Sequence, residues 1–298
     1  MKKTDIIILT EDRYVNPSVI NDYNRNLLLE DQLVSDALKN EGIRVGRKSW
    51  SDSNFDWSST KFIIFRSTWD YFDRYDEFSI WLKNVSTKTT LLNSAEIINW
   101  NIDKHYLLDL KQKGIHICES FFIEKGTTTS LLELHKKLGW QKTVLKPCIS
   151  GAARHTYKLE KDTLQKHETI FQELISNEAM MLQPFQENII TKGEFSFIII
   201  NKKYSHAVLK MAKPGDFRVQ DDFGGTVQAY EASDTEIEFA EKAVKACKGS
   251  PMYARVDVIV DNKNKLAISE IELIEPELWF RNNHKAAKNL AKGIKKMM

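Results

Sequence analysis

The feature that most constrains the fold is a pair of alternating stretches, residues 253–261 and 266–273, separated by a four-residue polar turn. Successive side chains of a strand point to opposite faces, so Arg255 and Asp257 share one face and the intervening valines share the other. The two stretches therefore predict an antiparallel hairpin with one apolar and one charged face.

Acidic residues gather on the charged face of this hairpin. A symmetric register across the turn at 262–265 places Asp257 opposite Glu270 and Arg255 opposite Glu272. Opposed like charges destabilise a strand pair unless a cation lies between them. Three carboxylates suit a hard cation such as Mg²⁺, although a solvated acidic face is the alternative. On the second strand, the alternation assigns three residues to the charged face: Ile268, Glu270 and Glu272.

Charge and length narrow the classes of protein that fit. The chain has 298 residues, enough for two packed domains, and its 43 basic and 41 acidic residues give a net charge of +2. Such a balance argues against a nucleic-acid binder that neutralises phosphates. Five lysines between residues 285 and 296 predict the solvated face of a final helix.

The cysteines and the apolar runs indicate the compartment. Cys118, Cys148 and Cys247 are odd in number and widely spaced, which predicts neither a disulfide framework nor a zinc cluster. No apolar run approaches the length that crosses a membrane. The sequence therefore favours a cytoplasmic protein without a membrane partner.

The first part of the chain predicts a small α/β domain over residues 1–93. A helix is expected over 27–40, where Val34, Ala37 and Leu38 form an apolar face. Short buried strands are expected over 5–9, 43–45, 62–65 and 90–92.

The segment after the strand 62–65 is a candidate substrate site, because ligands of open α/β sheets gather beyond the carboxyl ends of strands. Arg66 can hold a carboxylate there, and Trp69 can form a wall. Polar orientation is expected from Ser67, Thr68 and Asp70. The alternative is that the aromatic side chains only pack the loop.

From residue 94 the pattern changes and predicts a second domain, 94–298, divided into subdomains 94–182 and 183–298. Lys104 begins a helix and Lys146 ends an apolar strand. A loop of small residues follows, whose backbone amides can approach phosphates closely: Ser150, Gly151 and Ala152. The loop is neither a Walker motif nor a dinucleotide fingerprint, so it is a weak signal alone.

Three further segments suit a nucleotide. Residues 183–187, which include Gln183, Pro184, Phe185 and Glu187, can accommodate a purine, with backbone groups pairing with its edge. Glu194 can accept hydrogen bonds from ribose hydroxyls. Arg218 suits a transferring phosphoryl group, with a surface ion pair to Asp216 or Asp221 as the alternative.

The order of these residues resembles the ATP-grasp superfamily over roughly residues 94–280. The resemblance implies an α/β fold in which a small N-terminal domain precedes an ATP-grasp domain whose two subdomains clasp ATP. It implies that Lys104 and Lys146 bind phosphates and that Asp257, Glu270 and Glu272 bind magnesium, with manganese as a substitute. Ligases of the RimK type usually end this motif in Glu-x-Asn, whereas this chain has a glutamate at the last position.

A narrower likeness is to the ATP-grasp subgroup that includes the cyclo-ligase making D-cycloserine. The segments that carry it are 66–71, 100–104, 205–210, 215–220, 253–257 and 272–276. The resemblance implies an ADP-forming ligase that joins a carboxylate to an amine through an acyl phosphate and acts on a small amino-acid-like substrate. A ligase acting on peptide or protein termini and a non-catalytic ATP-binding regulatory module are the alternatives, and a homodimer is left open.

The implied mechanism assigns roles to individual residues. Lys146, Arg218 and Arg255 stabilise the transferring phosphoryl group or the carboxylate. Glu275 is placed with the substrate and, like His206, is a candidate to take a proton from the amine. The small-residue loop and the Gly215–Gly225 segment are candidate lids that keep water from the acyl phosphate.

Overall fold

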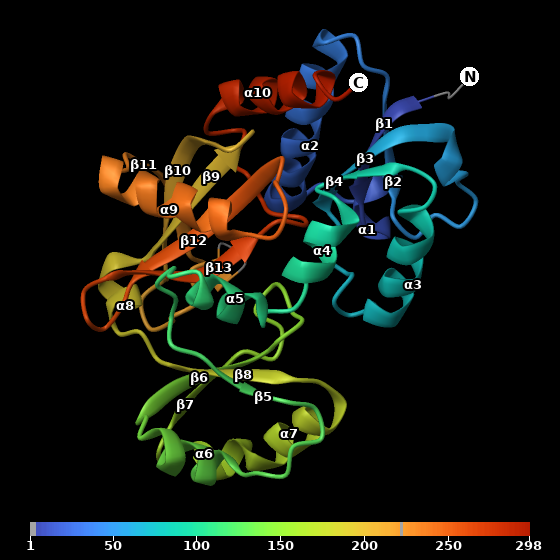
Figure 1. Ribbon diagram of the computed structural model, residues 1–298. Helices are drawn as coiled ribbons and strands as arrows, with labels where there is room; N and C mark the ends of the chain where they lie inside the picture. The colour runs from blue at the N-terminus through green and yellow to red at the C-terminus, as the bar shows by residue number, and fades with distance from the viewer. Residues whose placement is uncertain (1–3, 221–222) are drawn as a thin grey trace.

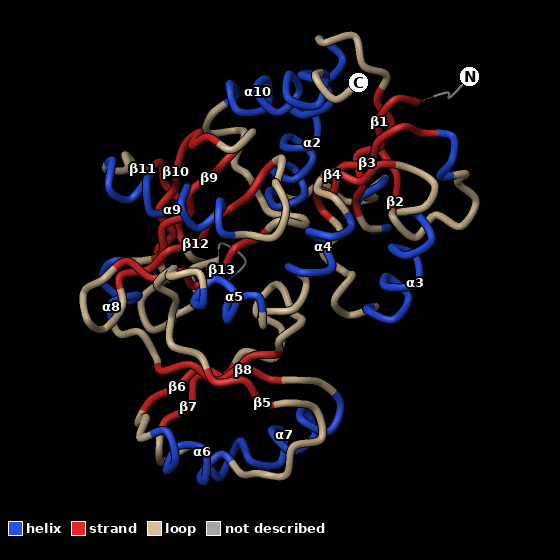
Figure 2. The backbone as a smooth tube through the Cα atoms, in the orientation of Figure 1, coloured by secondary structure: helices blue, strands red, loops and turns tan. Residues whose placement is uncertain are grey.

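The computed structural model describes residues 4–220 and 223–298. Three separate sheets organise this part of the chain (Figures 1 and 2). The first is parallel, in the order β2-β1-β3-β4, with strands β1 (Thr4–Thr10), β2 (Val45–Ser49), β3 (Thr60–Ser67) and β4 (Thr90–Leu92). It is accompanied by α1 (Asp12–Val15), α2 (Asp22–Asn40), η1 (Trp57–Ser59) and α3 (Tyr75–Val85).

Several elements around the first sheet have other bounds than the sequence predicts; β3, for example, runs from Thr60 to Ser67 rather than over 62–65. Helix α2 starts at Asp22, five residues earlier than expected, because the Asn21 side chain accepts from the backbone N–H of Asn24 and caps the helix. The second strand begins at Val45 because Ile43 still belongs to the helix end. The Ile43 N–H donates to the Leu38 carbonyl at 3.1 Å, and Gly42 before it has a φ of +76°.

The second sheet is antiparallel and forms a separate lobe with α6 (Leu131–Leu138) and α7 (Leu164–Asn177) on its outer side (Figure 1). Its order is β5-β8-β6-β7, with β5 (Phe121–Ile123), β6 (Lys142–Pro147), β7 (Tyr157–Glu160) and β8 (Met180–Pro184). One apolar core joins the lobe's sheet to its two helices, with Leu145 and Phe171 fully buried in it. The lobe therefore has a core of its own.

The third sheet carries the acidic hairpin. Its order is β11-β10-β9-β12-β13, with β9 (Glu194–Ile200), β10 (Lys203–Met211), β11 (Thr226–Tyr230), β12 (Tyr253–Val260) and β13 (Leu266–Glu272). Helices near it are α4 (Ala95–Asn101), α5 (Tyr106–Gln112), α8 (Asn188–Lys192), α9 (Asp234–Ala246) and α10 (His284–Lys295). Helix α10 packs on α2, and Leu290 and Ile294 share a core with Leu38 (Figure 1). The end of the chain thus joins the first and third sheets, and the division at residue 93 stays a prediction.

The hairpin confirms the expected register but reaches it by another route. Asp257 pairs with Glu270 and Arg255 with Glu272, as predicted. The loop has three residues rather than four, because the Asp261 N–H donates to the Lys265 carbonyl at 2.8 Å. A register shift between Asp257 and Val258 compensates for the missing residue.

This bulge corrects one sequence assignment. Ile268 was expected beside Glu270 on the charged face, but the extra residue, Ser269, turns it over, and Ile268 is fully buried in the core. The Ser269 hydroxyl points to the charged side, where it donates to Glu194 at 2.8 Å. The charged face is therefore more polar than strict alternation predicts.

None of the helices in the described ranges combines the length and apolarity that a membrane crossing needs. The lysines of α10 are exposed, as the sequence predicts: Lys285, Lys288, Lys292, Lys295 and Lys296. The opposite face of that helix supplies the buried side chains that contact α2.

Asn93, between β4 and α4, ties the first sheet to the third. Its side-chain amide donates to the carbonyls of Tyr253 (2.9 Å) and Leu273 (2.7 Å), and its oxygen accepts from the Met252 N–H (2.6 Å). The side chain is 2% exposed. Three backbone groups thus depend on one buried amide.

We expect Asn93→Ala to lower the free energy of unfolding by roughly 2 kcal/mol or more, because it leaves these backbone groups without partners. Urea denaturation followed by circular dichroism measures the change. Asn84→Ala, at an exposed position of α3, is the control and should stay within about 0.5 kcal/mol of the parent protein. Equal stability of the two variants would contradict the role given to Asn93.

Candidate active site

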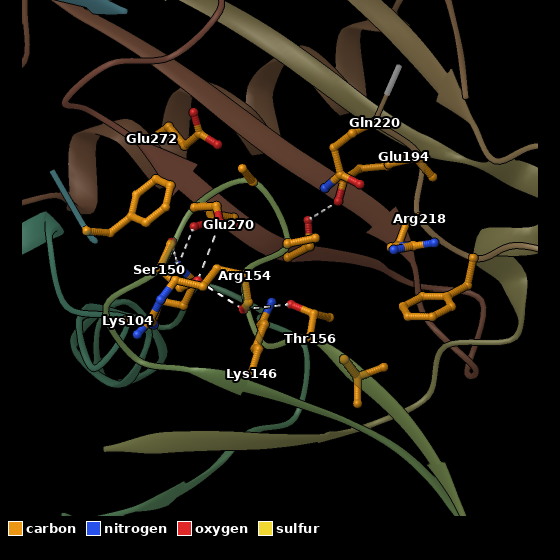
Figure 3. Close-up of a pocket in the computed structure, with 18 of the residues that line it drawn as sticks. Lys104, Lys146, Ser150, Arg154, Thr156, Glu194, Arg218, Gln220, Glu270 and Glu272 are labelled. Atoms are coloured by element: carbon orange, nitrogen blue, oxygen red, sulfur yellow. Dashed lines mark hydrogen bonds and ion pairs between the residues drawn. The ribbon is translucent and has the colours of Figure 1, made fainter. Parts of the chain in front are cut away.

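A cleft of about 670 Å³ lies where the three sheets meet. Strands β6 and β8 and the loop after β6 form one wall, and β12 and β13 form the opposite wall (Figure 3). Trp69 and Phe72, from the loop after β3, line the end nearest the first sheet. Lys104 and Glu270 form an ion pair within the cleft, with Nζ and Oε1 2.9 Å apart.

The predicted metal ligands lie together but differ in access. Glu270 and Glu272 line the cleft, whereas Asp257 is 2% exposed and lies behind them. Arg255 binds Asp257 through three contacts of 2.9–3.1 Å and also pairs with Glu272. Arg255 thus offsets the negative charge at position 272, where RimK-type ligases have asparagine.

Burial and these cations set the pKa values of the three acids. Burial opposes the charge of Asp257, but Arg255 and Lys210 lower its pKa to about 2. Burial also opposes the charge of Glu270, and Lys104 lowers its pKa below the ordinary value. For Glu272, burial prevails and raises the pKa to about 7. A further cation beside Glu272 would therefore favour its charged form.

Lys210 is a functional candidate that sequence reasoning did not assign. It is 4% exposed, and its Nζ lies 2.5 Å from Glu194 and 3.3 Å from Asp257. The ring of Trp279 lies under both cations, with its centroid 5.9 Å from Lys210 Nζ and 5.3 Å from Arg255 Cζ. The available signal was a lysine directly after three apolar residues, 207–209, in a segment that predicts a strand.

The two predicted phosphate lysines have different surroundings. Lys104 donates to the Ser150 carbonyl at 2.7 Å, and although burial opposes its charge, Glu270 raises its pKa. Within the described ranges, the Lys146 ammonium has no ion-pair or hydrogen-bond partner, and burial lowers its pKa. Lys146 is therefore a cleft cation with its bonding capacity unused.

The small-residue loop lies where the sequence places it. Ser150, Gly151 and Ala152 all line the cleft, next to Lys104 and Lys146 (Figure 3). Arg154 also lines it and was not predicted. The loop therefore forms the part of the cleft wall that lies beside both lysines.

At the other end of the cleft, the predicted adenine segment is present with its backbone partly engaged. Gln183, Pro184 and Phe185 line the cleft, and the Phe185 ring lies edge-on to Phe217 with centroids 5.8 Å apart. However, the Phe185 N–H donates to the Lys142 carbonyl, and its carbonyl accepts from Asn262. The Phe185 N–H is thus unavailable to an adenine edge, which corrects that part of the expectation.

Two of the remaining nucleotide candidates line the cleft and one does not. Glu194 pairs with Lys210, and Arg218 forms a bidentate pair with Asp216 (3.1 and 2.7 Å). Glu187 pairs with Lys142 outside the lining residues, with a side chain 57% exposed. The pair of Arg218 with Asp216 was the alternative to a catalytic role, and Arg218 combines it with a place in the cleft. Asp221 lies outside the described residues.

Of the predicted substrate residues, Trp69 and Glu275 line the cleft. Burial and neighbouring Glu272 raise the pKa of Glu275 to about 8. Arg66 is 3% exposed, donates to the Pro276 carbonyl and lies within 4.0 Å of Glu30 and Asp31. The expected contact of Arg66 with a substrate carboxylate is not supported, because protein groups enclose its guanidinium and it does not line the cleft.

The polar neighbours of Arg66 also support the loop from within. The hydroxyl of Ser67 bonds that of Thr10 at 2.8 Å, and Thr68 is fully buried. Asp70 accepts from Trp50 at 2.7 Å and from Arg74 at 2.8 Å. These three residues therefore do not line the main cleft. Tyr14 and Tyr23 do, beside Trp69, and the sequence analysis did not single them out.

Comparisons with known proteins agree with this geometry. Residues 6–93 match the family described as "D-cycloserine synthetase DcsG, N-terminal domain". Residues 125–277, about half of the chain, match "Prokaryotic glutathione synthetase, ATP-grasp domain". The cycloserine biosynthesis protein DcsG of Streptomyces lavendulae is 26% identical over 287 residues, which cover 92% of this chain and 93% of that protein.

Solved structures show the same fold. The crystal structure of D-cycloserine synthetase DcsG superposes with a TM-score of 0.86 at 24% identity, covering 98% of this chain and 99% of that one. The ATP-grasp ligase PsnB with its precursor peptide PsnA2 and AMPPNP gives 0.60 at 17% identity, covering 99% and 98%. D-Alanine–D-alanine ligase from Bacillus anthracis gives 0.68 at 15% identity, covering 98% and 96%. The expected resemblance is thus confirmed, and this chain belongs to the ATP-grasp ligases, in the family of the prokaryotic glutathione synthetase ATP-grasp domain.

Proposed function

We propose that this ligase uses the γ-phosphate of ATP to convert the carboxylate of a small amino-acid-like substrate into an acyl phosphate, which an amine then attacks to form an amide. The observation that carries the proposal is Lys146, a cleft ammonium whose side chain lacks a partner within the described ranges. It lies beside a small-residue loop and in the same cleft as the half-buried carboxylates of Glu270 and Glu272. A phosphate group supplies the partner that this lysine lacks.

The acidic wall fits Mg²⁺. Its donors are all carboxylate oxygens, and the pKa of Glu272, raised to about 7 by burial, indicates a carboxylate that a nearby divalent cation would stabilise. Glu270 and Glu272 would hold the ion from the cleft, and Asp257 would support them from behind. A bound Mg²⁺ neutralises phosphate charge. Mn²⁺ shares this preference for oxygen ligands and is proposed as a substitute.

The cations of the cleft bind and orient the phosphates. Lys104 and Lys146, with the amides of 150–152, take the phosphate chain, and the forked guanidinium of Arg218 takes the transferring group after exchanging Asp216 for it. Arg255 turns toward the developing acyl phosphate while Asp257 fixes its position. The Phe185 and Phe217 rings contact the adenine faces, and Glu194 accepts from the ribose.

The substrate end favours a small molecule. Tyr14 and Tyr23 both pack against Trp69, with ring centroids 6.1 Å from it in each case, and the three side chains line the cleft on the side of the first sheet. Glu275 lines this end of the cleft and is the proposed acceptor of the amine proton, since a pKa raised to about 8 makes its ionised form a stronger base than an ordinary carboxylate. The relative DcsG supports an amino-acid-like substrate, and PsnB, solved with a peptide, keeps the peptide alternative testable.

We expect Lys146→Met to lower the rate of ADP formation by about 100-fold or more, because it removes a charge that stabilises the transferring phosphoryl group. A coupled assay for ADP measures this rate. Lys142→Met is the matched control: it lies on the same strand, is exposed, and pairs with Glu187. Loss of activity in the control, or full activity in Lys146→Met, would contradict the assignment.

Asp257→Asn should raise the Mg²⁺ concentration for half-maximal ADP formation by about tenfold or more, because Asp257 orients Arg255 and Lys210 behind the metal-binding acids. Asp162→Asn, an exposed change in the separate lobe, should leave the requirement unchanged. A normal Mg²⁺ requirement in Asp257→Asn, with folding verified by circular dichroism, would exclude this role.

The substrate class is tested by incubating the enzyme with ATP, Mg²⁺ and pooled amino acids that include O-ureido-serine, followed by mass spectrometry. We expect acceptor-dependent ADP and a product one water lighter than its substrates. ADP formation with peptides alone would favour the peptide alternative. ATP binding without ADP from any acceptor would support a non-catalytic module instead.

A further inference from the structure

The small-residue loop, residues 148–156, has an unusual backbone. The backbone is left-handed at Ala152, Ala153 and His155, with φ values of +48°, +54° and +47°, a conformation that residues other than glycine rarely adopt. Bonds within the loop are present: the Arg154 N–H donates to the Gly151 carbonyl at 2.9 Å, and the Ser150 hydroxyl to the Arg154 carbonyl at 3.2 Å. Such strained conformations persist where the surroundings over-determine them.

Arg154 connects the loop to two other parts of the chain. Its two terminal nitrogens bond the Glu178 carboxylate at 2.9 and 2.8 Å, which holds the guanidinium near the start of β8 in the second sheet. Its Nε lies 3.3 Å from an Asp73 oxygen, and Asp73 belongs to the loop after β3 of the first sheet. Arg154 thus contacts both the lobe of the second sheet, through Glu178, and the loop after β3 of the first sheet, through Asp73.

Phe72, next to Asp73, adds a packing contact between the loop after β3 and the small-residue loop. A Cβ added to Gly151 would lie 2.6 Å from Cε1 of the Phe72 ring, closer than any real contact. Gly151 is not in the left-handed region, so its missing side chain serves close approach rather than backbone conformation. Phe72 is 8% exposed and lines the cleft.

The opposite end of the loop is tied to the acidic wall. Lys104 donates to the Ser150 carbonyl at 2.7 Å and pairs with Glu270 at 2.9 Å (Figure 3). Polar contacts therefore run from Glu270 through Lys104, Ser150 and Arg154 to Asp73. The loop lies along the cleft and is held at both ends, by Lys104 next to the acidic hairpin and by Asp73 next to the first sheet.

We propose that Phe72 and Asp73 are positioning residues that clamp residues 148–156 over the cleft, so that water is kept from the acyl phosphate until the amine attacks. The inference rests on the proposed function. Without the clamp, water adds to the acyl carbon, the bond to the phosphate oxygen breaks, and the carboxylate and inorganic phosphate are released. One ATP is then consumed with no amide formed.

Amide hydrogen exchange of the ligand-free protein, followed by mass spectrometry of peptides spanning 148–156, tests the clamp directly. Asp73→Asn should speed exchange of these amides by about two- to fivefold, the factor expected for a partly exposed ion pair. Asp73→Glu should restore much of the protection. Asp76→Asn, exposed at the start of α3, is the control and should change nothing. Unchanged exchange in Asp73→Asn would overturn the proposal.

A change of side-chain size tests the packing contact independently of charge. Gly151→Ala should open the loop, because the new methyl group meets the Phe72 ring, and should speed loop exchange. Adding Phe72→Ala to Gly151→Ala should relieve the clash, so the double variant should exchange more slowly than the effects of the two single variants combined. Additive effects would show that Gly151 and Phe72 do not act through this contact.

The ratio of amide to ADP separates clamping from catalysis. In the ligation assay, Asp73→Asn should lower this ratio at least twofold while ADP formation continues, and Asp73→Glu should raise it again. An unchanged ratio alongside faster loop exchange would overturn the role in excluding water. If the parent protein forms no ADP with any acceptor, the proposed function fails, whereas the exchange experiment still decides whether Phe72 and Asp73 hold the loop.

Discussion

The ion-pair network on the acidic hairpin is the interaction on which the site depends. Asp257 lies behind the cleft wall and is bound by both Arg255 and Lys210, which extend the network to Glu272 and Glu194. Removing one partner would leave an uncompensated buried charge, which is costly. The network therefore fixes Glu272, one of the acids proposed to hold a metal, and Arg255, the cation proposed to face the acyl phosphate.

The position of that network follows from the register of two strands. Asp257 and Glu270 are direct partners, as are Arg255 and Glu272, so the hairpin alone brings these four charges together. The remaining groups come from other sheets: Lys146 ends β6, Lys104 precedes α5, and Trp69 follows β3. A cleft at the junction of three sheets can combine a nucleotide region with a separate substrate region.

The sequence predicted the parts of this site that local pattern determines. Alternation and the turn identified the hairpin register, and the order of lysines, glycines and acids identified the ATP-grasp fold. The Ile268 assignment was wrong for a geometric reason. The shorter loop and the bulge cancel in the pairing of Asp257 with Glu270, but the residues between the loop and the bulge face the opposite side from the prediction. Arg66 was expected just beyond a strand end, but β3 continues to Ser67, and packing against Glu30 and Asp31 encloses the Arg66 side chain. Lys210 gained its place by pairing with Glu194 across β9 and β10 and also with Asp257 on β12, a contact between strands distant in sequence that no local pattern specifies.

The central claim is that phosphate is transferred from ATP to a substrate carboxylate. It is tested most directly with a carboxylate substrate labelled with ¹⁸O in both oxygens, by measuring the mass of the inorganic phosphate released during ligation. The account predicts that each phosphate carries one ¹⁸O atom, because the carboxylate oxygen that bonded the phosphorus leaves with it when the amine attacks. Release of unlabelled phosphate alongside labelled amide product would contradict an acyl-phosphate intermediate.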